Sequence, residues 1–235
     1  MGMLRRFTWC LFLLLLITGM GLFGMGCNRS SSSSDSKNDA AEQESEDNPS
    51  SSSGNSTQER APSPVLVAWG DSLTTGIALP GRTPYPERVA LITGMQVINA
   101  GVSGESACAG AKRASSVTRH SPRAVFILFG TNDVIAGHDL ANSKECIRSM
   151  IRAAIGIGAR PIVGTIPPML GPMDHLNKRV DRMNRLIQEV AREERCRLVD
   201  LHRQFGDGSG LLLEDGFHPN EVGTQLIAFA FAESL

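Results

Sequence analysis

The chain has 235 residues, of which 41% are hydrophobic, and its formal net charge is −1 at pH 7. This balance excludes a strongly basic face for binding nucleic acid. The histidines and cysteines lack the short spacing of metal ligands, and no glycine loop has the lysine or the spacing of a phosphate-binding motif. We therefore expect neither a metal nor another cofactor.

Residues 1–26 have the pattern of a secretory signal peptide. Two arginines precede an apolar run, 7–20, which is too short to favour a membrane-spanning helix. The run leads into "GMGC", which resembles the cleavage box of a bacterial lipoprotein, although Gly24 stands where that box usually has leucine. We expect export and a lipid on Cys27 as the new N-terminus. An ordinary cleaved signal and an uncleaved anchor are the alternatives.

Residues 27–63 carry almost no apolar side chains and are rich in serine and acidic residues. Such a segment cannot bury enough surface to offset the entropy of ordering, so we interpret it as a disordered tether that follows the lipid-anchor cysteine. Residues 64–235 have the size of one domain. The expected location is the bacterial cell envelope, facing the periplasm or at the outer membrane, with membrane contact through the lipid anchor.

The domain alternates short β-branched runs with longer amphipathic segments. The predicted strands are 65–69, 96–100, 124–129, 161–166 and 197–201. The predicted helices are 84–93, 104–116, 140–157, 174–195 and 219–234. Repeated β-α units with right-handed crossovers predict an α/β fold, a flavodoxin-like three-layer sandwich with a five-stranded parallel sheet in the order 2-1-3-4-5.

The segments that follow the first three strands hold unusual residues. "GDSLT" places Ser72 just after the first strand, "NAGVSGES" follows the second and "GTND" follows the third. In an open parallel sheet these loops share the carboxyl edge, where ligands bind. A fourth segment, "EDGFHPN", places Asp215 three residues before His218 in a turn. The carboxylate can therefore orient the imidazole as the base that a serine nucleophile needs.

These four segments resemble, in order, the four signature blocks of the SGNH, or GDSL, hydrolase family. The matching residues are 70–74, 99–106, 130–133 and 215–219, so the resemblance spans the whole domain. It is nearest to the compact bacterial branch of thioesterases, lysophospholipases and arylesterases. The resemblance implies a flavodoxin-like fold and hydrolysis of carboxylic esters or thioesters.

The resemblance also assigns roles. Ser72 is the nucleophile, His218 the base and Asp215 the residue that orients it. The oxyanion hole consists of the backbone N–H groups of Ser72 and Gly104 and the side-chain amide of Asn132. Taken singly, the serine is typical of a helix N-cap, the glycine of a helix start and the asparagine of a turn.

Two neighbouring carboxylates, Asp71 and Asp133, are expected to orient these loops rather than to react. Two other functions stay open on the same fold, an acyltransferase and a non-catalytic carbohydrate-binding protein. The expected substrate is a small-molecule ester or a lipid or sugar ester, with short to medium acyl chains and little demand on the alcohol. Apolar stretches within 133–139, 166–173 and 210–213 are either the lining of an acyl groove or cover for the sheet.

The domain contains three cysteines. Cys196 stands at the entry to the fifth strand and is expected to be a small buried hydrophobe. Cys108 and Cys146 fall at similar depth on two helices that this topology makes neighbours, so an oxidising compartment would allow a disulfide. Because helical phase cannot be fixed from sequence, the favoured interpretation is two reduced core cysteines, with the bridge as the alternative.

Overall fold

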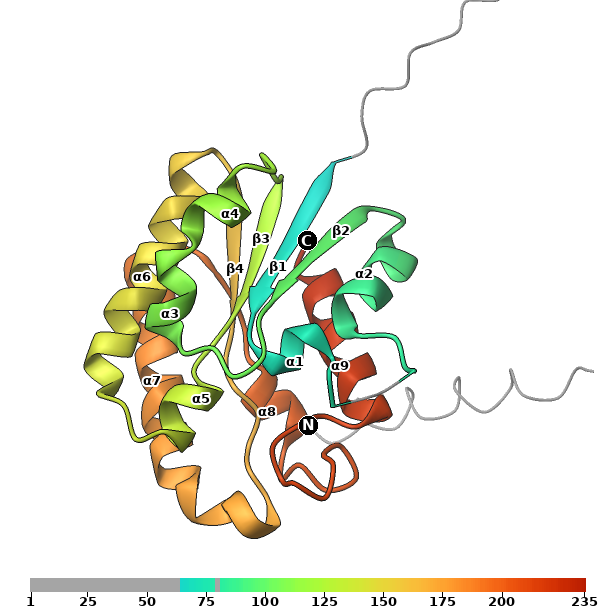
Figure 1. The fold of residues 1–235 in the computed structure, drawn as a ribbon, viewed down its shortest axis with the longest axis vertical. Coiled ribbons are helices and arrows are strands. Elements are labelled where there is room, and N and C mark those ends of the chain that lie inside the picture. The colour runs from blue at the N-terminus through green and yellow to red at the C-terminus, as the bar shows by residue number, and fades with distance from the viewer. Residues whose placement is uncertain (1–63, 79–80) are drawn as a thin grey trace, which may run out of the picture. The chain divides into compact units, whose positions relative to one another are not determined.

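A five-stranded parallel sheet organises residues 64–78 and 81–235, the part of the chain that the computed structural model describes (Figure 1). The strands are β1 (Val65–Gly70), β2 (Gln96–Gly101), β3 (Ala124–Leu128), β4 (Arg160–Gly164) and β5 (Arg197–Val199). Their order is β2-β1-β3-β4-β5, and every neighbouring pair is parallel. The predicted α/β fold and strand order are confirmed. The predicted signal peptide, Cys27 and the tether lie outside the described residues.

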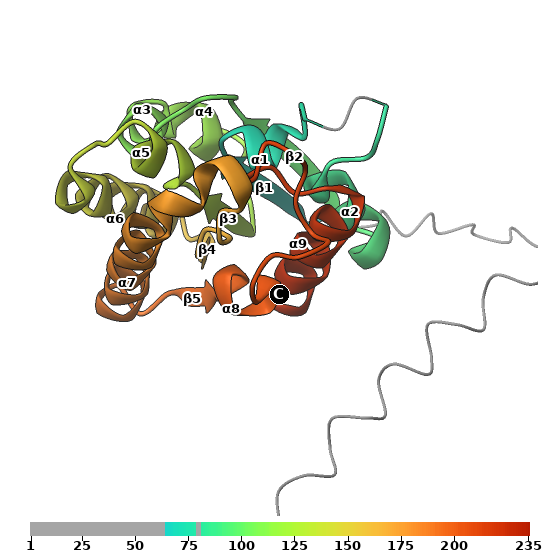
Figure 2. The same ribbon diagram turned by 90° about the horizontal axis from the view of Figure 1, so that it is seen from below.

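Helices cover both faces of the sheet (Figures 1 and 2). They are α1 (Ser72–Thr75), α2 (Tyr85–Thr93), α3 (Ala107–Lys112), α4 (Ala114–Thr118), α5 (Thr131–Ile135), α6 (Leu140–Gly156), the 3₁₀ helix η1 (Gly171–Leu176), α7 (Asn177–Glu193), α8 (Leu201–Phe205) and α9 (Glu221–Glu233). Helices α3, α6 and α7 pack on one face, and α2 and α9 pack on the other. Among the described residues, no helix has the length and apolarity that crossing a membrane requires.

Alternation along β1 shows why the sheet has two apolar faces. Val67 and Trp69 belong to the core under α3, α6 and α7, whereas Leu66 and Ala68 belong to the core under α2 and α9. Successive side chains of a strand point to opposite faces, so a central strand covered on both sides reads as a continuous apolar run. Because β1 is packed on both faces, its carboxyl end is a rigid support for the loop that carries Ser72.

One helix expected as a single element, 104–116, is two helices. The Ser106 Oγ accepts a hydrogen bond from the Ala109 N–H at 3.3 Å, which caps α3 and sets its start at Ala107. Arg113 then separates α3 from α4. The chain before this cap forms a turn that contains Gly104 and is closed by a hydrogen bond from the Glu105 N–H to the Val102 carbonyl at 3.2 Å.

The fifth strand is shorter than expected. It ends at Val199, because Asp200 caps the unexpected helix α8 through a hydrogen bond from the Arg203 N–H to its Oδ1 at 3.2 Å. A local side-chain cap thus ends a strand that the apolar pattern alone would extend to 201.

Candidate active site

Ser72 lies where β1 ends and α1 begins. Asp71 is the N-cap of α1, and its Oδ1 accepts the Leu73 N–H at 2.9 Å, so Ser72 is the first helical residue rather than the cap. A Cβ on Gly70 would lie 2.0 Å from Thr74 Oγ1 and 2.7 Å from the Leu128 carbonyl oxygen, so the turn admits only glycine there. The tight turn places a nearly buried serine hydroxyl at the carboxyl edge of the sheet.

The three side chains Ser72, His218 and Asp215 form one line of hydrogen bonds. Ser72 Oγ lies 3.0 Å from His218 Nε2, and His218 Nδ1 lies 2.7 Å from Asp215 Oδ2. The second oxygen, Asp215 Oδ1, accepts the backbone N–H groups of Phe217 and His218 at 3.1 and 3.0 Å. The structure therefore brings together three residues that span 146 positions of the chain, from 72 to 218.

Asp215 is held as a carboxylate. Partial burial acts to raise its pKa, but the hydrogen bonds from the His218 amide, the His218 ring and the Phe217 amide outweigh burial, and the pKa lies below its ordinary value of 3.8. An ionised Asp215 accepts a proton-bearing Nδ1, which leaves Nε2 of His218 as the nitrogen that faces Ser72. That tautomer is the one a general base requires.

The loop that carries Asp215 and His218 is fixed by its backbone. Gly216 has φ +80°, and a Cβ there would lie 2.0 Å from the Leu170 carbonyl oxygen. The Leu170 N–H donates to the Gly216 carbonyl at 2.8 Å, and the Leu213 N–H donates to the His218 carbonyl at 2.8 Å. The segment after β4 therefore holds the loop that carries Asp215 and His218, through a contact of Leu170 that no sequence pattern indicated.

The other predicted oxyanion donors, Asn132 and Gly104, lie on two segments that are hydrogen-bonded to each other. The Asn132 Nδ2 on α5 donates to the Glu105 carbonyl at 3.0 Å and to Asp71 Oδ2 at 3.3 Å. Gly104 precedes Glu105 and has φ +76°, with nothing within 4 Å of a hypothetical Cβ. The left-handed backbone conformation at this position therefore favours glycine.

Asp71 and Asp133 are buried and bind neighbouring loops. Burial is the main cause that raises the pKa of Asp71 from 3.8 to about 7; the Leu73 N–H opposes this and the nearby charge of Asp133 adds to it. Asp133 Oδ2 accepts the Ala107 N–H at 2.9 Å, and its Oδ1 accepts the Ser143 hydroxyl at 2.7 Å. Asp133 therefore ties α5 to the starts of α3 and α6.

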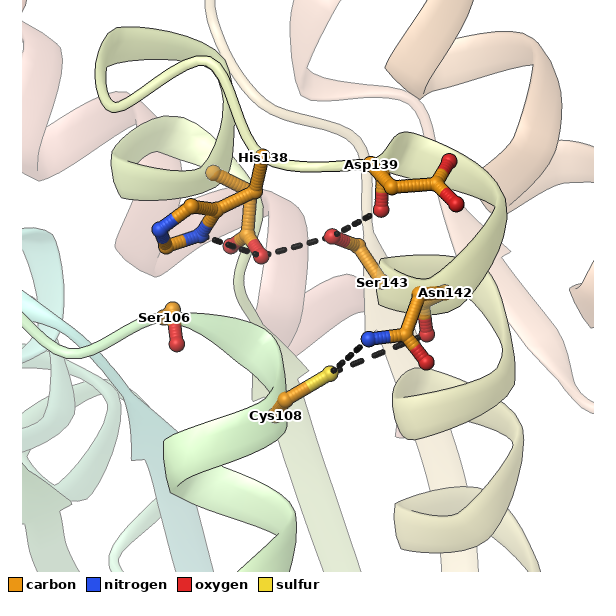
Figure 3. Close-up of a pocket in the computed structure, with 7 residues that line it drawn as sticks. Ser106, Cys108, His138, Asp139, Asn142 and Ser143 are labelled. Carbon is orange, nitrogen blue, oxygen red and sulfur yellow. Dashed lines mark hydrogen bonds and ion pairs between the residues drawn. The ribbon is translucent and has the colours of Figure 1, made fainter.

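A pocket of about 270 Å³ opens between Ser106 and Cys108 on one side and His138, Asn142 and Ser143 on the other (Figure 3). It is lined by Ser106, Cys108, Asp133, His138, Asp139, Asn142 and Ser143. The lining contains none of the line Ser72–His218–Asp215. Within the described residues, no group of three or more histidines, cysteines or carboxylates is arranged to hold a metal ion.

Cys108 and Cys146 form a disulfide with a Cα–Cα distance of 5.0 Å. The favoured interpretation of two reduced cysteines was therefore wrong: the helical phases of α3 and α6 do bring the two Cβ atoms together. Cys196 is half-buried and is the free thiol among the described residues. Burial raises its pKa to about 11, which makes it a poor nucleophile near neutral pH.

The apolar stretches proposed as a groove or as cover are mainly cover. Ile166 and Met169 are buried in one core, and Leu211 and Leu212 pack against the other. Exposed apolar side chains on the segments that follow β1 and β2 are instead Ile77, after α1, and Val102, whose N–H donates to the Gly70 carbonyl.

A five-stranded parallel sheet in this order, covered by helices on both faces, is a flavodoxin-like α/β fold, and the serine–histidine–aspartate line at its carboxyl edge is a candidate hydrolase site. The chain belongs to the GDSL-like lipase/acylhydrolase family, whose family model matches residues 68–226. The predicted resemblance to that family is confirmed.

Particular relatives agree with this assignment. The thioesterase 1/protease 1/lysophospholipase L1 of Escherichia coli K12 is 23% identical over 186 residues, which cover 76% of this chain and 86% of that protein. Among solved structures, a G-D-S-L family lipolytic protein from Veillonella parvula has a TM-score of 0.64 at 22% identity, covering 72% of this chain and 96% of that one. A catalytic mutant of an acetylxylan esterase from Geobacillus stearothermophilus has a TM-score of 0.64 at 22% identity, covering 73% and 93%. The two structures share the fold.

Proposed function

We propose that this chain hydrolyses carboxylic esters or thioesters with Ser72 as nucleophile. The observation that carries the proposal is the line of hydrogen bonds from Ser72 Oγ through His218 to Asp215, at 3.0 and 2.7 Å. A serine hydroxyl is a weak nucleophile unless a base accepts its proton as it attacks. Here the base is within reach and its orientation is fixed by a carboxylate.

The reaction proceeds in two halves. Ser72 Oγ attacks the acyl carbon and its proton passes to His218 Nε2; the intermediate then expels the alcohol or thiol, which takes that proton. In the second half, water attacks the acyl-serine and His218 receives a proton from that water. His218 then gives this proton to Ser72 Oγ as the acid leaves. Asp215 stabilises the imidazolium formed in each half.

The negative charge that develops on the former carbonyl oxygen is stabilised by hydrogen bonds from the N–H groups of Ser72 and Gly104 and from the side-chain amide of Asn132. The Asn132 amide has two hydrogens, and the shorter contact, to the Glu105 carbonyl at 3.0 Å, fixes its plane. The longer contact, to Asp71 at 3.3 Å, is the one that an oxyanion replaces. Loss of one such donor costs about 3–4 kcal/mol in the transition state.

The full chain should cleave a p-nitrophenyl ester or an acyl thioester, and a fluorophosphonate should label Ser72. We expect Ser72→Ala to lose at least about a thousandfold in kcat. Ser209→Ala, at an exposed loop serine, serves as the matched control and should keep full activity. An active Ser72→Ala variant would overturn the mechanism. A folded wild-type chain that resists the fluorophosphonate would favour the carbohydrate-binding alternative, and acyl products on an added sugar would favour transfer.

We also propose that residues 1–26 direct export and that Cys27 carries the lipid anchor. The Cys108–Cys146 disulfide supports an oxidising compartment, because such bonds persist outside the reducing cytosol. Cys27→Ala should move the protein from the detergent phase to the aqueous phase in a detergent-partition assay, whereas Cys196→Ala should not. Detergent-phase partition that survives Cys27→Ala would refute the anchor.

A further inference from the structure

A guanidinium lies under the loop that joins the nucleophile strand to the predicted oxyanion glycine. Arg113, between α3 and α4, donates through Nε to both carboxylate oxygens of Glu105, at 2.9 and 2.8 Å, and through Nη2 to Glu105 Oε2 at 2.6 Å. The Glu105 side chain is 9% exposed and the Arg113 side chain 21%. This is a largely buried, multidentate ion pair, whose fork geometry fixes both partners.

The same guanidinium also reaches β1. Arg113 Nη2 donates to the Gly70 carbonyl at 3.3 Å, and the Val102 N–H donates to that same carbonyl at 2.9 Å. Gly70 is two residues before Ser72. Arg113 therefore links the end of the nucleophile strand to the loop 102–105.

The main chain of Glu105 is where this link meets the proposed chemistry. The Glu105 carbonyl accepts the Asn132 Nδ2 at 3.0 Å, and Gly104 directly precedes Glu105. Gly104 itself has open space around it, so no side-chain packing at that residue fixes the loop. The ion pair with Arg113 fixes the Glu105 side chain, and the Glu105 side chain in turn fixes this part of the loop.

We propose that Arg113, acting through Glu105, is a positioning residue that sets the oxyanion hole. This inference rests on the proposed ester hydrolysis. One guanidinium couples all three donors: Ser72 through Gly70, Gly104 as the neighbour of Glu105, and Asn132 through the Glu105 carbonyl. Donors act on a transition state only when they are held within about 0.5 Å of the productive geometry. An ion pair that fixes backbone on both sides of the hole supplies this rigidity.

Arg113→Gln tests the proposal by steady-state kinetics on a p-nitrophenyl ester. We expect kcat to fall about 10- to 100-fold, less than the loss of a whole donor, with KM changed less than about threefold, because the lost interaction acts in the transition state. Arg113→Lys keeps the positive charge but loses the planar fork of donors, so its kcat should lie between those of Arg113→Gln and the wild type.

The matched control is Arg88→Gln. Arg88 is also a largely buried arginine that pairs with a carboxylate, Glu221, and donates to a backbone carbonyl, that of Thr83, but it joins α2 to α9. It should lose thermal stability to a similar extent while kcat stays within about twofold of the wild type. A merely structural role for Arg113 would give both variants the same profile.

A second readout is independent of turnover. The side-chain amide resonances of Asn132, identified by their loss in Asn132→Asp, should shift in Arg113→Gln and not in Arg88→Gln. If Arg113→Gln does not fold, Glu105→Gln replaces it, since that change keeps the carbonyl and removes the charge. Unchanged Asn132 resonances, or a kcat within twofold of the Arg88→Gln value, would overturn the inference. An inactive wild type with shifted Asn132 resonances would overturn the proposed hydrolysis and leave the positioning role supported.

Discussion

The Asn132 side-chain amide lies 3.3 Å from Asp71 Oδ2, so the predicted oxyanion donor contacts the residue that immediately precedes Ser72. Asp71 is fully buried and its pKa is raised to about 7. The surroundings of the Asp71 carboxyl therefore disfavour its charged form. The contribution of Asp71 to the free energy of unfolding consequently depends on pH.

The first prediction concerns this pH dependence of stability. The folded chain keeps a proton on Asp71 that the unfolded chain loses near pH 4, so raising the pH from about 4 to about 7 lowers the free energy of unfolding. Asp71→Asn keeps an acceptor for the Leu73 N–H, loses the acceptor for Asn132 Nδ2 and removes the titration. We expect the free energy of unfolding of the variant, relative to that of the wild type, to rise by about 2–4 kcal/mol between pH 4 and pH 8 in urea unfolding.

Asp139→Asn is the control for this measurement, because Asp139 is the exposed N-cap of α6 and accepts a comparable hydrogen bond from the Ala141 N–H. It should leave the pH dependence of stability as in the wild type. Equal pH dependence in Asp71→Asn and the wild type would contradict the assigned burial of the Asp71 charge.

The second prediction concerns the orienting carboxylate. Asp215→Asn removes the charge that stabilises the imidazolium and lets the amide favour the wrong imidazole tautomer, so kcat should fall by about a thousandfold or more. Asp207→Asn, at an exposed aspartate in the loop after α8, is the control and should retain activity. Stopped-flow or steady-state ester hydrolysis measures both. A loss in Asp215→Asn of less than tenfold would remove Asp215 from the triad.

The third prediction concerns the disulfide. The Cys108–Cys146 bond closes a segment with a separation of 38 residues, so opening it should lower the free energy of unfolding by about 2–4 kcal/mol. A reductant should reproduce that loss in Cys196→Ala and should have no effect on the Cys108→Ser/Cys146→Ser double variant. Alkylation of the unreduced, denatured chain followed by peptide mass analysis should find Cys196 labelled. Label on either bridged cysteine would refute the bond.

The fourth prediction concerns acyl-chain length. Ile77 and Val102 are 63% and 44% exposed, and Val102 lies on the loop bound to Gly70. If they contact the acyl group, kcat/KM should be highest for short to medium chains. Val102→Ser should lower kcat/KM for a medium chain about three- to tenfold and leave an acetyl ester unaffected. Leu91→Ser, at an 80% exposed residue of α2, is the control. A rate that rises steeply with chain length in the wild type would contradict this preference.

The sequence predicted the sheet order because β-branched runs and right-handed crossovers leave few topologies. It also selected Ser72, Asp215 and His218, which the structure places within hydrogen-bond distance. It did not predict the pair Asp71–Asn132, whose members are 61 positions apart and meet only through the folded carboxyl edge. Local spacing carries information about turns and caps, whereas such contacts depend on tertiary packing.

The sequence also could not predict which way the side chains on a helix point. Apolar periodicity placed α3 and α6 as neighbours, but whether Cys108 faces Cys146 depends on where α3 begins, and the Ser106 cap determines that. The ion pair between Glu105 and Arg113 has the same origin. Both residues lie within the single helix expected at 104–116, and the pair instead joins the loop before α3 to the residue that follows it.

The backbone hydrogen bond from the Leu170 N–H to the Gly216 carbonyl makes the Leu170 amide a reporter of the loop that carries Asp215 and His218. The Leu170 amide can exchange its hydrogen with solvent only when the loop that carries Asp215 and His218 separates from the segment after β4. Its protection factor therefore measures how often the loop with Asp215 and His218 opens. Ligands that close the site should slow this exchange, and substitutions of Gly216 should abolish its protection before the sheet itself unfolds.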